Sequence, residues 1–214
     1  FEISGKEMSI DEILDIVCQD QIFYENSGGG MTLSGGELTS HQDFARSLLI
    51  EGKKRNLHLA IDTNGHSDWS TLKELADLSD VVLFDIKHLD NKLHKAATGV
   101  NNSKVLKNLD LLSQTDTEIW VRIPVIPGFS DTSEYQSQVA NYLGDLSGDI
   151  CRVDLIPYHN WCEPKYDWLG KNWKYTDREA MEPEELETFK ALYQSKGLNV
   201  VIGGSGFASS ESHL

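Results

Sequence analysis

The chain lacks any apolar stretch close to the roughly 18 residues that a membrane-spanning helix needs. Basic residues are also scarce: 19 lysines and arginines stand against 34 acidic residues, which gives a formal net charge of −15. Sequence-independent nucleic-acid binding and adsorption to anionic membranes both require a basic surface. We therefore expect no nucleic-acid partner and no membrane partner, and we interpret the negative charge mainly as a source of solubility.

Cysteine is rare, and its three copies, Cys18, Cys151 and Cys162, are scattered along the chain. An odd, dispersed count is no disulfide framework and is typical of a reducing compartment, so we expect a cytoplasmic protein. No two of these cysteines are close enough in sequence for a local metal-binding knuckle. The first residues carry neither a signal-peptide pattern nor an initiator methionine, so we expect a fragment of a longer protein.

What the chain does have is a regular alternation of apolar runs and amphipathic segments. Hydrophobic residues make up 39% of its 214 residues, enough for the core of one sizeable domain. The pattern predicts strands at 31–33, 57–61, 80–86, 118–126, 151–157 and 198–202. It predicts helices at about 9–24, 41–52, 69–78, 103–113, 133–146 and 183–197.

Apolar strands that alternate with helices predict an α/β fold, in which helices cover a parallel sheet. A closed eight-stranded barrel normally needs about 250 residues, so six strands favour a partial (β/α)6-type barrel. We expect residues 1–204 to form this barrel domain and residues 205–214 to be a flexible tail. Residues 158–180 are expected to form a long aromatic loop, either a lid, a partner-binding face or plain packing.

Small polar clusters follow the predicted strands, and one guanidinium interrupts a strand. They are Ser34-Gly35-Gly36-Glu37, Asp62-Thr63-Asn64-Gly65, Asp85-Ile86-Lys87-His88 and Tyr158-His159, with Arg122 inside the fourth strand. The carboxyl ends of parallel strands meet at one mouth of a barrel, so we expect these groups to form a site.

The single clusters also have ordinary structural interpretations. The glycine pair before Glu37 leaves backbone N–H groups accessible, but it also suits a common turn. Asp62 ends a strand although aspartate is depleted there. Asp85 and Lys87 lie two residues apart on one face, where they either neutralise each other or bind a zwitterion. Arg122 needs an anionic partner, from the core or from a ligand.

In their order and spacing these motifs resemble the activating enzymes of glycyl-radical enzymes, within the radical S-adenosylmethionine superfamily. The resemblance covers about residues 5–204 and rests on five segments: Ser27 to Glu37, Ala60 to Gly65, Leu83 to His88, Val121 to Gly128 and Leu155 to His159. It implies a partial radical S-adenosylmethionine barrel.

The resemblance also implies a set of residues that hold S-adenosylmethionine. These are Gly35, Gly36 and Glu37 at the methionyl amino group, Asp62 as a cofactor-side carboxylate, Asn64, Asp85, Ile86 and Lys87 as further contacts, Arg122 as support for the zwitterion, and His159 at the ribose and adenine end. Lys87 would pair with the methionyl carboxylate. Asp62 and Asp85 would be the ligands of a possible monovalent cation.

The implied activity is that of an oxidoreductase. A [4Fe-4S] cluster and S-adenosylmethionine would generate a 5′-deoxyadenosyl radical, which would abstract hydrogen from a glycine of a partner enzyme. The implied partners are that glycyl-radical enzyme, through its glycine loop, and a flavodoxin or ferredoxin-type electron donor.

The chain departs from the family pattern in two ways. Leu38 stands where the family usually has proline, and the cluster motif C-x-x-x-C-x-x-C is absent from these residues. We therefore expect that the first strand and cluster loop are missing, that no catalytic cysteine lies in this chain, and that the chain alone is inactive. Two alternatives stay open: an aldolase-like barrel enzyme with Lys87 as Schiff-base nucleophile, and a non-catalytic binding module.

Overall fold

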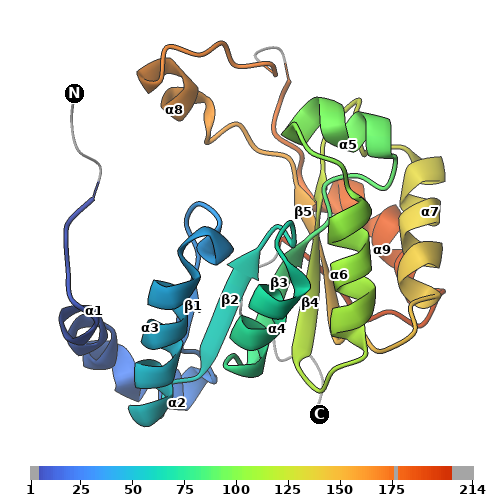
Figure 1. Ribbon diagram of the computed structural model, residues 1–214. Helices are drawn as coiled ribbons and strands as arrows, with labels where there is room; N and C mark the ends of the chain where they lie inside the picture. Colours follow the sequence, from blue (N-terminus) through green and yellow to red (C-terminus); the bar gives the residue numbers. More distant parts are fainter. Residues whose placement is uncertain (1–4, 176–177, 204–214) are drawn as a thin grey trace. The chain divides into compact units, whose positions relative to one another are not determined.

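The computed structural model describes residues 5–175 and 178–203 (Figure 1). The chain divides into two compact units, one made of Phe1–Phe84 with Lys104–Ile119 and the other of Asp85–Ser103 with Trp120–Leu214. Each unit is built from parallel strands and flanking helices, as the sequence pattern predicts. No helix in the described part of the chain has the length and apolar character needed to cross a membrane.

The first unit holds β1 (Met31–Leu33), β2 (Leu59–Thr63) and most of β3 (Val81–Asp85), which pair in parallel in chain order. Its helices are α1 (Ile10–Val17), η1 (Cys18–Asp20), α2 (Gln21–Ser27), η2 (Leu38–His41), α3 (Gln42–Lys54), α4 (Trp69–Asp77) and α6 (Ser103–Ser113). Ser9 and Glu12 form the capping box that begins α1. Figure 1 shows α3 lying along β1 and β2.

Strand β2 shows how the sequence decides which side chains reach the core of the first unit. Leu59, Ile61 and Thr63 are buried, whereas Ala60 and Asp62 between them are half-buried. Successive side chains of a strand point to opposite faces, so Asp62 lies on the face opposite to Ile61. The strand thus buries its apolar positions and presents a carboxylate at its carboxyl end.

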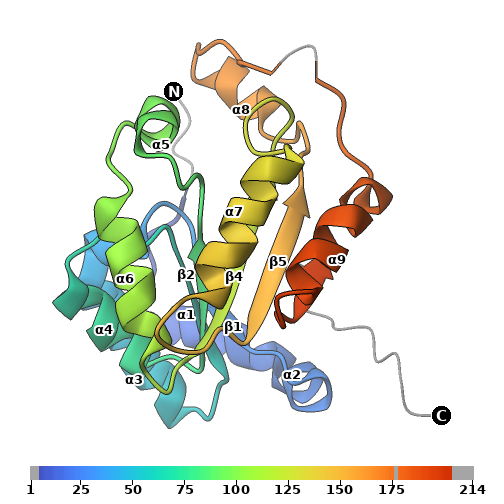
Figure 2. The ribbon, with the colours of Figure 1, turned by 90° about the vertical axis from the view of Figure 1, so that its right-hand side faces the viewer.

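The second unit holds β4 (Glu118–Val125), β5 (Arg152–Pro157) and β6 (Val200–Ile202), which are also parallel in chain order. Its helices are α5 (Asn91–Thr98), α7 (Ser133–Gly144), α8 (Glu163–Trp168), η3 (Pro183–Leu186) and α9 (Glu187–Gln194). Figure 2 shows α7 and α9 beside β5, and α8 beyond its carboxyl end. The buried Tyr193 hydroxyl donates to Gln136 Oε1 at 2.6 Å and ties α9 to α7.

The predicted fold class is confirmed, and the differences are local. The predicted helix 9–24 is divided by η1, and the strand predicted at 57–61 lies at Leu59–Thr63. Helix α5 occupies a stretch predicted as polar loop, because Asp90 caps it and Gly99 ends it in the left-handed conformation. Helix α8 lies inside the predicted aromatic loop. The predicted tail at 205–214 lies outside the described residues.

Candidate functional site

In the first unit, the polar residues that follow β1 and β2 are joined by hydrogen bonds. Ser34 Oγ donates to Asp62 Oδ2 at 2.9 Å. Glu37 Oε1 accepts from Thr63 Oγ1 at 2.8 Å, and Glu37 Oε2 accepts from the backbone N–H of Asn64 at 2.9 Å. The structure therefore brings the predicted residues Glu37, Asp62 and Asn64 together at the carboxyl ends of two neighbouring strands.

The carboxylate of Glu37 is held in one orientation. Besides Thr63 and Asn64, it accepts from the hydroxyl of Thr39 at 2.9 Å and caps η2 through the Thr39 N–H at 3.3 Å. Gly35 has a φ of 128°, a backbone conformation that favours glycine, and a Cβ added at Gly35 or Gly36 would meet nothing within 4 Å. The loop is thus anchored by its glutamate and leaves open space beside its glycines.

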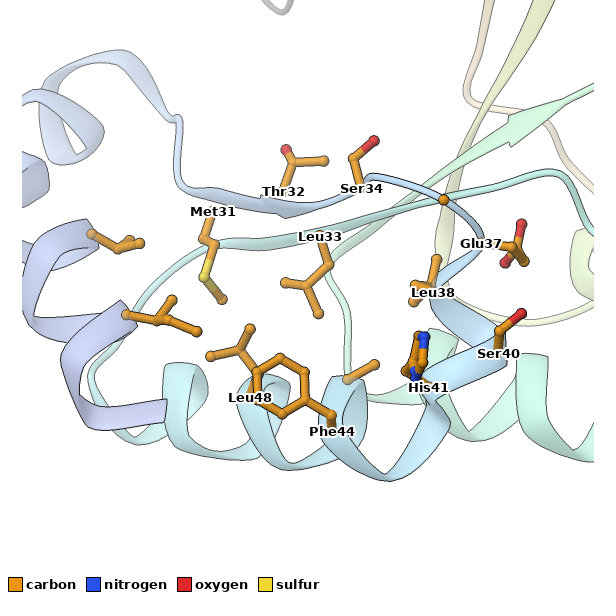
Figure 3. A pocket seen from close by; sticks show the side chains of 14 residues that line it. Met31, Thr32, Leu33, Ser34, Glu37, Leu38, Ser40, His41, Phe44 and Leu48 are labelled. Atoms are coloured by element: carbon orange, nitrogen blue, oxygen red, sulfur yellow. The ribbon is translucent and has the colours of Figure 1, made fainter. Parts of the chain in front are cut away.

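A cavity of about 680 Å³ lies next to this cluster in the first unit. Apolar side chains form most of its wall: Met31 and Leu33 of β1, Leu38, and Phe44 and Leu48 of α3, together with Ile13 and Val17 of α1. Figure 3 shows Thr32 and Ser34 on the opposite side of β1 from Met31 and Leu33. Ser34, Gly36 and Glu37 also line the cavity, so its mostly apolar wall continues into the polar residues after β1.

In the second unit, Asp85 bridges the two predicted cations. Its Oδ2 lies 2.8 Å from Lys87 Nζ, and its Oδ1 lies 2.8 Å from Arg122 Nε. The side chains of Asp85 and Arg122 are mostly buried, whereas that of Lys87 is 39% exposed. Ile86 is buried at 1% exposure, and its N–H donates to the Arg122 carbonyl at 3.0 Å. Any ligand contact of Ile86 must therefore come from its backbone.

These charged groups line a cavity of about 340 Å³ within the second unit. Its other walls are Pro124, Ile126, Ile156, Pro157, Tyr158, His159, Cys162, Trp173 and Tyr175. His159 Nδ1 and the Tyr158 hydroxyl are buried there without a hydrogen-bond partner among residues 5–175 and 178–203. Buried polar atoms are normally paired, so these two atoms are suited to a ligand or an ordered water.

The aromatic segment after β5 contributes to this cavity in part. Trp173 and Tyr175 line the cavity and pack edge to face, with ring centroids 5.8 Å apart. Trp161 and Trp168, by contrast, are 79% and 82% exposed. Plain packing therefore explains only some of these aromatic residues.

The sequence pattern did not predict the buried charge of Asp154, because residues 153–156 were interpreted as one apolar run. Asp154 is 1% exposed and accepts from Arg152 Nε, and the Arg152 guanidinium lies 4.2 Å from the ring of Trp120. Asp154 stands opposite Arg122 in the β4–β5 register. Burial raises the pKa of Asp154, and the two arginines partly offset this rise. A single aspartate among Val, Leu and Ile is the signal that could have identified it.

The described residues do not fit a [4Fe-4S] cluster. Cys18 is half-buried in the first unit, whereas Cys151 and Cys162 are exposed in the second. Across residues 5–175 and 178–203, no three or more His, Cys, Asp or Glu side chains group in a way that could hold a metal ion. The cation site predicted at Asp62 and Asp85 stays a prediction.

No protein-family model matches the chain. Among curated proteins, it is 36% identical over 206 residues to the trans-4-hydroxy-L-proline dehydratase activating enzyme of Clostridioides difficile, covering 95% of this chain and 68% of that protein. It is 36% identical over 204 residues to the pyruvate formate-lyase 2-activating enzyme of Escherichia coli (strain K12), covering 95% of this chain and 69% of that protein.

A third relative is the (2S)-3-sulfopropanediol sulfolyase activating enzyme of Bilophila wadsworthia, 39% identical over 180 residues, which are 83% of this chain and 59% of that protein. The chain thus spans 59 to 69% of the length of these three relatives. Among solved structures, a domain of the pyruvate-formate lyase-activating enzyme from Bacteroides vulgatus matches with a TM-score of 0.69 and 25% identity, covering 82% of this chain and 99% of that one.

Proposed function

The chain belongs to the activating enzymes of glycyl-radical enzymes, and from this premise we propose that it is the cofactor-binding part of such an oxidoreductase. S-adenosylmethionine with a [4Fe-4S] cluster supplies the radical chemistry that removes hydrogen from a glycine of the partner enzyme. The residues of this chain hold and orient the methionyl and nucleoside parts of S-adenosylmethionine. Family membership favours this function over an aldolase-like one.

The observation that carries the proposal is the charged cluster that lines the cavity of the second unit. The second unit presents Lys87 and Arg122 on a single carboxylate, Asp85. The methionyl group carries an ammonium and a carboxylate, so it needs one acidic and one basic host. We assign Lys87 to the carboxylate, and the family pattern gives Glu37 for the ammonium.

The ion pair with Asp85 is compatible with this role of Lys87. An ammonium has three donors, and the contact with Asp85 Oδ2 at 2.8 Å uses one of them. Lys87 can therefore bind a ligand carboxylate without leaving Asp85. The carboxylate of Asp85 in turn fixes the direction in which the lysine side chain extends.

The cavity of the second unit supports the nucleoside end of the proposal. Its mixed wall of charged, apolar and aromatic side chains is typical of cofactor sites, where a few polar atoms fix the orientation of the ligand. His159 Nδ1 is buried without a partner in the described part of the chain, so a ribose hydroxyl or an adenine nitrogen would satisfy it. The rings of Trp173 and Tyr175 offer apolar surface to the base.

We further propose that the cluster ligands lie outside these 214 residues, since the three cysteines present do not group. The chain alone is then inactive as an activase. The proposed protein partner is a glycyl-radical enzyme, whose glycine loop is the substrate, and the proposed electron donor is a flavodoxin or a ferredoxin. The proposed location is the cytoplasm.

The test is equilibrium binding of S-adenosylmethionine under anaerobic conditions, with the longest form of the protein that its gene encodes. Lys87→Ala removes a charge-assisted hydrogen bond, so affinity should fall by about tenfold or more, the equivalent of about 1.5–3 kcal/mol. Lys92→Ala is the matched control, because Lys92 is exposed on α5 and should leave affinity unchanged. Equal affinities of Lys87→Ala and the wild type would contradict the assignment.

A further inference from the structure

The residue after Lys87 is a buried imidazole that the proposed function does not use. His88 is only 4% exposed, although the sequence places it in a polar stretch. Its ring stacks on Tyr135 with centroids 4.2 Å apart and lies tilted against Phe129 at 4.9 Å. Burial of a polar ring between two aromatic residues is costly unless its nitrogens are hydrogen-bonded.

The ring of His88 is bound to the backbone. Nδ1 accepts from the N–H of Asp90 at 2.9 Å, and a backbone hydrogen bond with Phe129 acts to raise the pKa of the ring. The ring is therefore neutral, with its proton on Nε2. The same turn is held twice more: the Tyr135 hydroxyl accepts from the Leu89 N–H at 3.2 Å, and the buried Asn102 amide donates to the His88 carbonyl at 3.2 Å.

The position of His88 explains why the side chain of Lys87 faces the cavity. From Asp85 onward the side chains alternate: Asp85 and Lys87 face the cavity, whereas Ile86 and His88 are buried. Ile86 is fixed by its backbone bond to β4, so His88 is the anchor on the other side of Lys87. We infer that His88 is a positioning residue, whose ring closes the turn after β3 and so holds Lys87 beside Asp85. Only the identity of the ligand rests on the proposed function.

The charge state of His88 gives the inference a second consequence. Burial lowers the pKa of His88 below its ordinary value of 6.5, against smaller opposing effects of the Phe129 backbone and of Asp90. The charged or titratable groups that face its ring are the Asp90 carboxylate, the His94 imidazole and the Tyr135 hydroxyl. A proton on Nδ1 removes the acceptor of the Asp90 N–H, so acid should release the turn without any mutation.

The direct test is the rate at which an acylating reagent labels Lys87, resolved by peptide mass spectrometry on the folded chain. His88→Phe keeps an aromatic ring but removes both hydrogen bonds. Lys87 should then be labelled about two- to fivefold faster, which is the change expected when a partly exposed ion pair is lost. The exposed Lys92, in the same samples, should not change. His94→Phe is the matched control, since His94 is equally buried at 4% but bonds to the Val100 carbonyl.

A rescue variant separates positioning from packing. Asparagine side chains accept from the N–H two residues on, so His88→Asn should restore the bond to Asp90 and return the Lys87 rate close to that of the wild type. An unchanged Lys87 rate in folded His88→Phe, or an equal rise in His94→Phe, would overturn the inference.

If His88→Phe does not fold, a pH titration of protein that keeps His88 tests the inference instead. In a His94→Phe background, the NMR signals of the Asp90 amide and the Lys87 side chain should titrate together, with a midpoint below 6.5. Separate midpoints would overturn the inference. Neither experiment contains S-adenosylmethionine, so its result is independent of whether the proposed cofactor binds.

Discussion

Asp85→Asn is the perturbation that most directly tests the charged cluster of the second unit. The substitution keeps the shape of the side chain but removes the charge that faces both Arg122 Nε and Lys87 Nζ, each at 2.8 Å. Arg122 is mostly buried, so loss of its charge-assisted bond should cost about 1.5–3 kcal/mol of unfolding free energy. Lys87 is 39% exposed, and solvent screening limits its share to about 0.5 kcal/mol.

The expected loss is therefore about 2–3.5 kcal/mol, measured as the shift in unfolding free energy by urea denaturation followed by circular dichroism. Asp68→Asn is the control, because the carboxylate of Asp68 is 81% exposed and its pair with Lys104 lies on the surface. It should change stability by no more than about 0.5 kcal/mol. A loss below about 0.5 kcal/mol in Asp85→Asn would refute the ion pairs as a stabilising feature in solution.

Two further predictions concern the framework around the site. Gly65 has a φ of 70°, and a Cβ there would clash with the ring of Phe84, so Gly65→Ala should cost about 2–5 kcal/mol in urea denaturation. Gly99→Ala, with φ 87° and open space, should cost only about 1–2 kcal/mol, and equal losses would contradict the clash. The pKa of Asp154 is raised above 3.8, so its stabilising contribution is fully present below that pH and is lost as the pH rises through the folded-state pKa. The stability of the wild type relative to Asp154→Asn should fall over this window, and a constant difference would contradict the raised pKa.

The polar residues of the site could be predicted because they interrupt or end apolar strands. Asp62, Asp85 and Arg122 stand out there, since charged side chains are rare in buried β-structure. The period-two alternation also places Asp85 and Lys87 on one face, and the ion pair between them confirms it.

The partners of those residues could not be predicted in the same way. Glu37 is anchored by Thr63, which is 26 positions away in sequence, and only the pairing of β1 with β2 brings the two together. The buried charge of Asp154 could not be predicted, because an apolar run predicts a strand whether or not one of its positions is charged. The burial of His88 depends on Phe129 and Tyr135, which no local pattern connects to it.

The charges of the two clusters, taken separately, restrict the charge of a ligand group that binds beside each. In the first unit, Glu37 and Asp62 bring two carboxylates to one cluster, which disfavours an anionic ligand group there. In the second unit, the Asp85 contact uses only one of the three donors of the Lys87 ammonium, so an anionic group is favoured beside Lys87. Within each unit, therefore, the cluster favours a ligand group of the opposite charge.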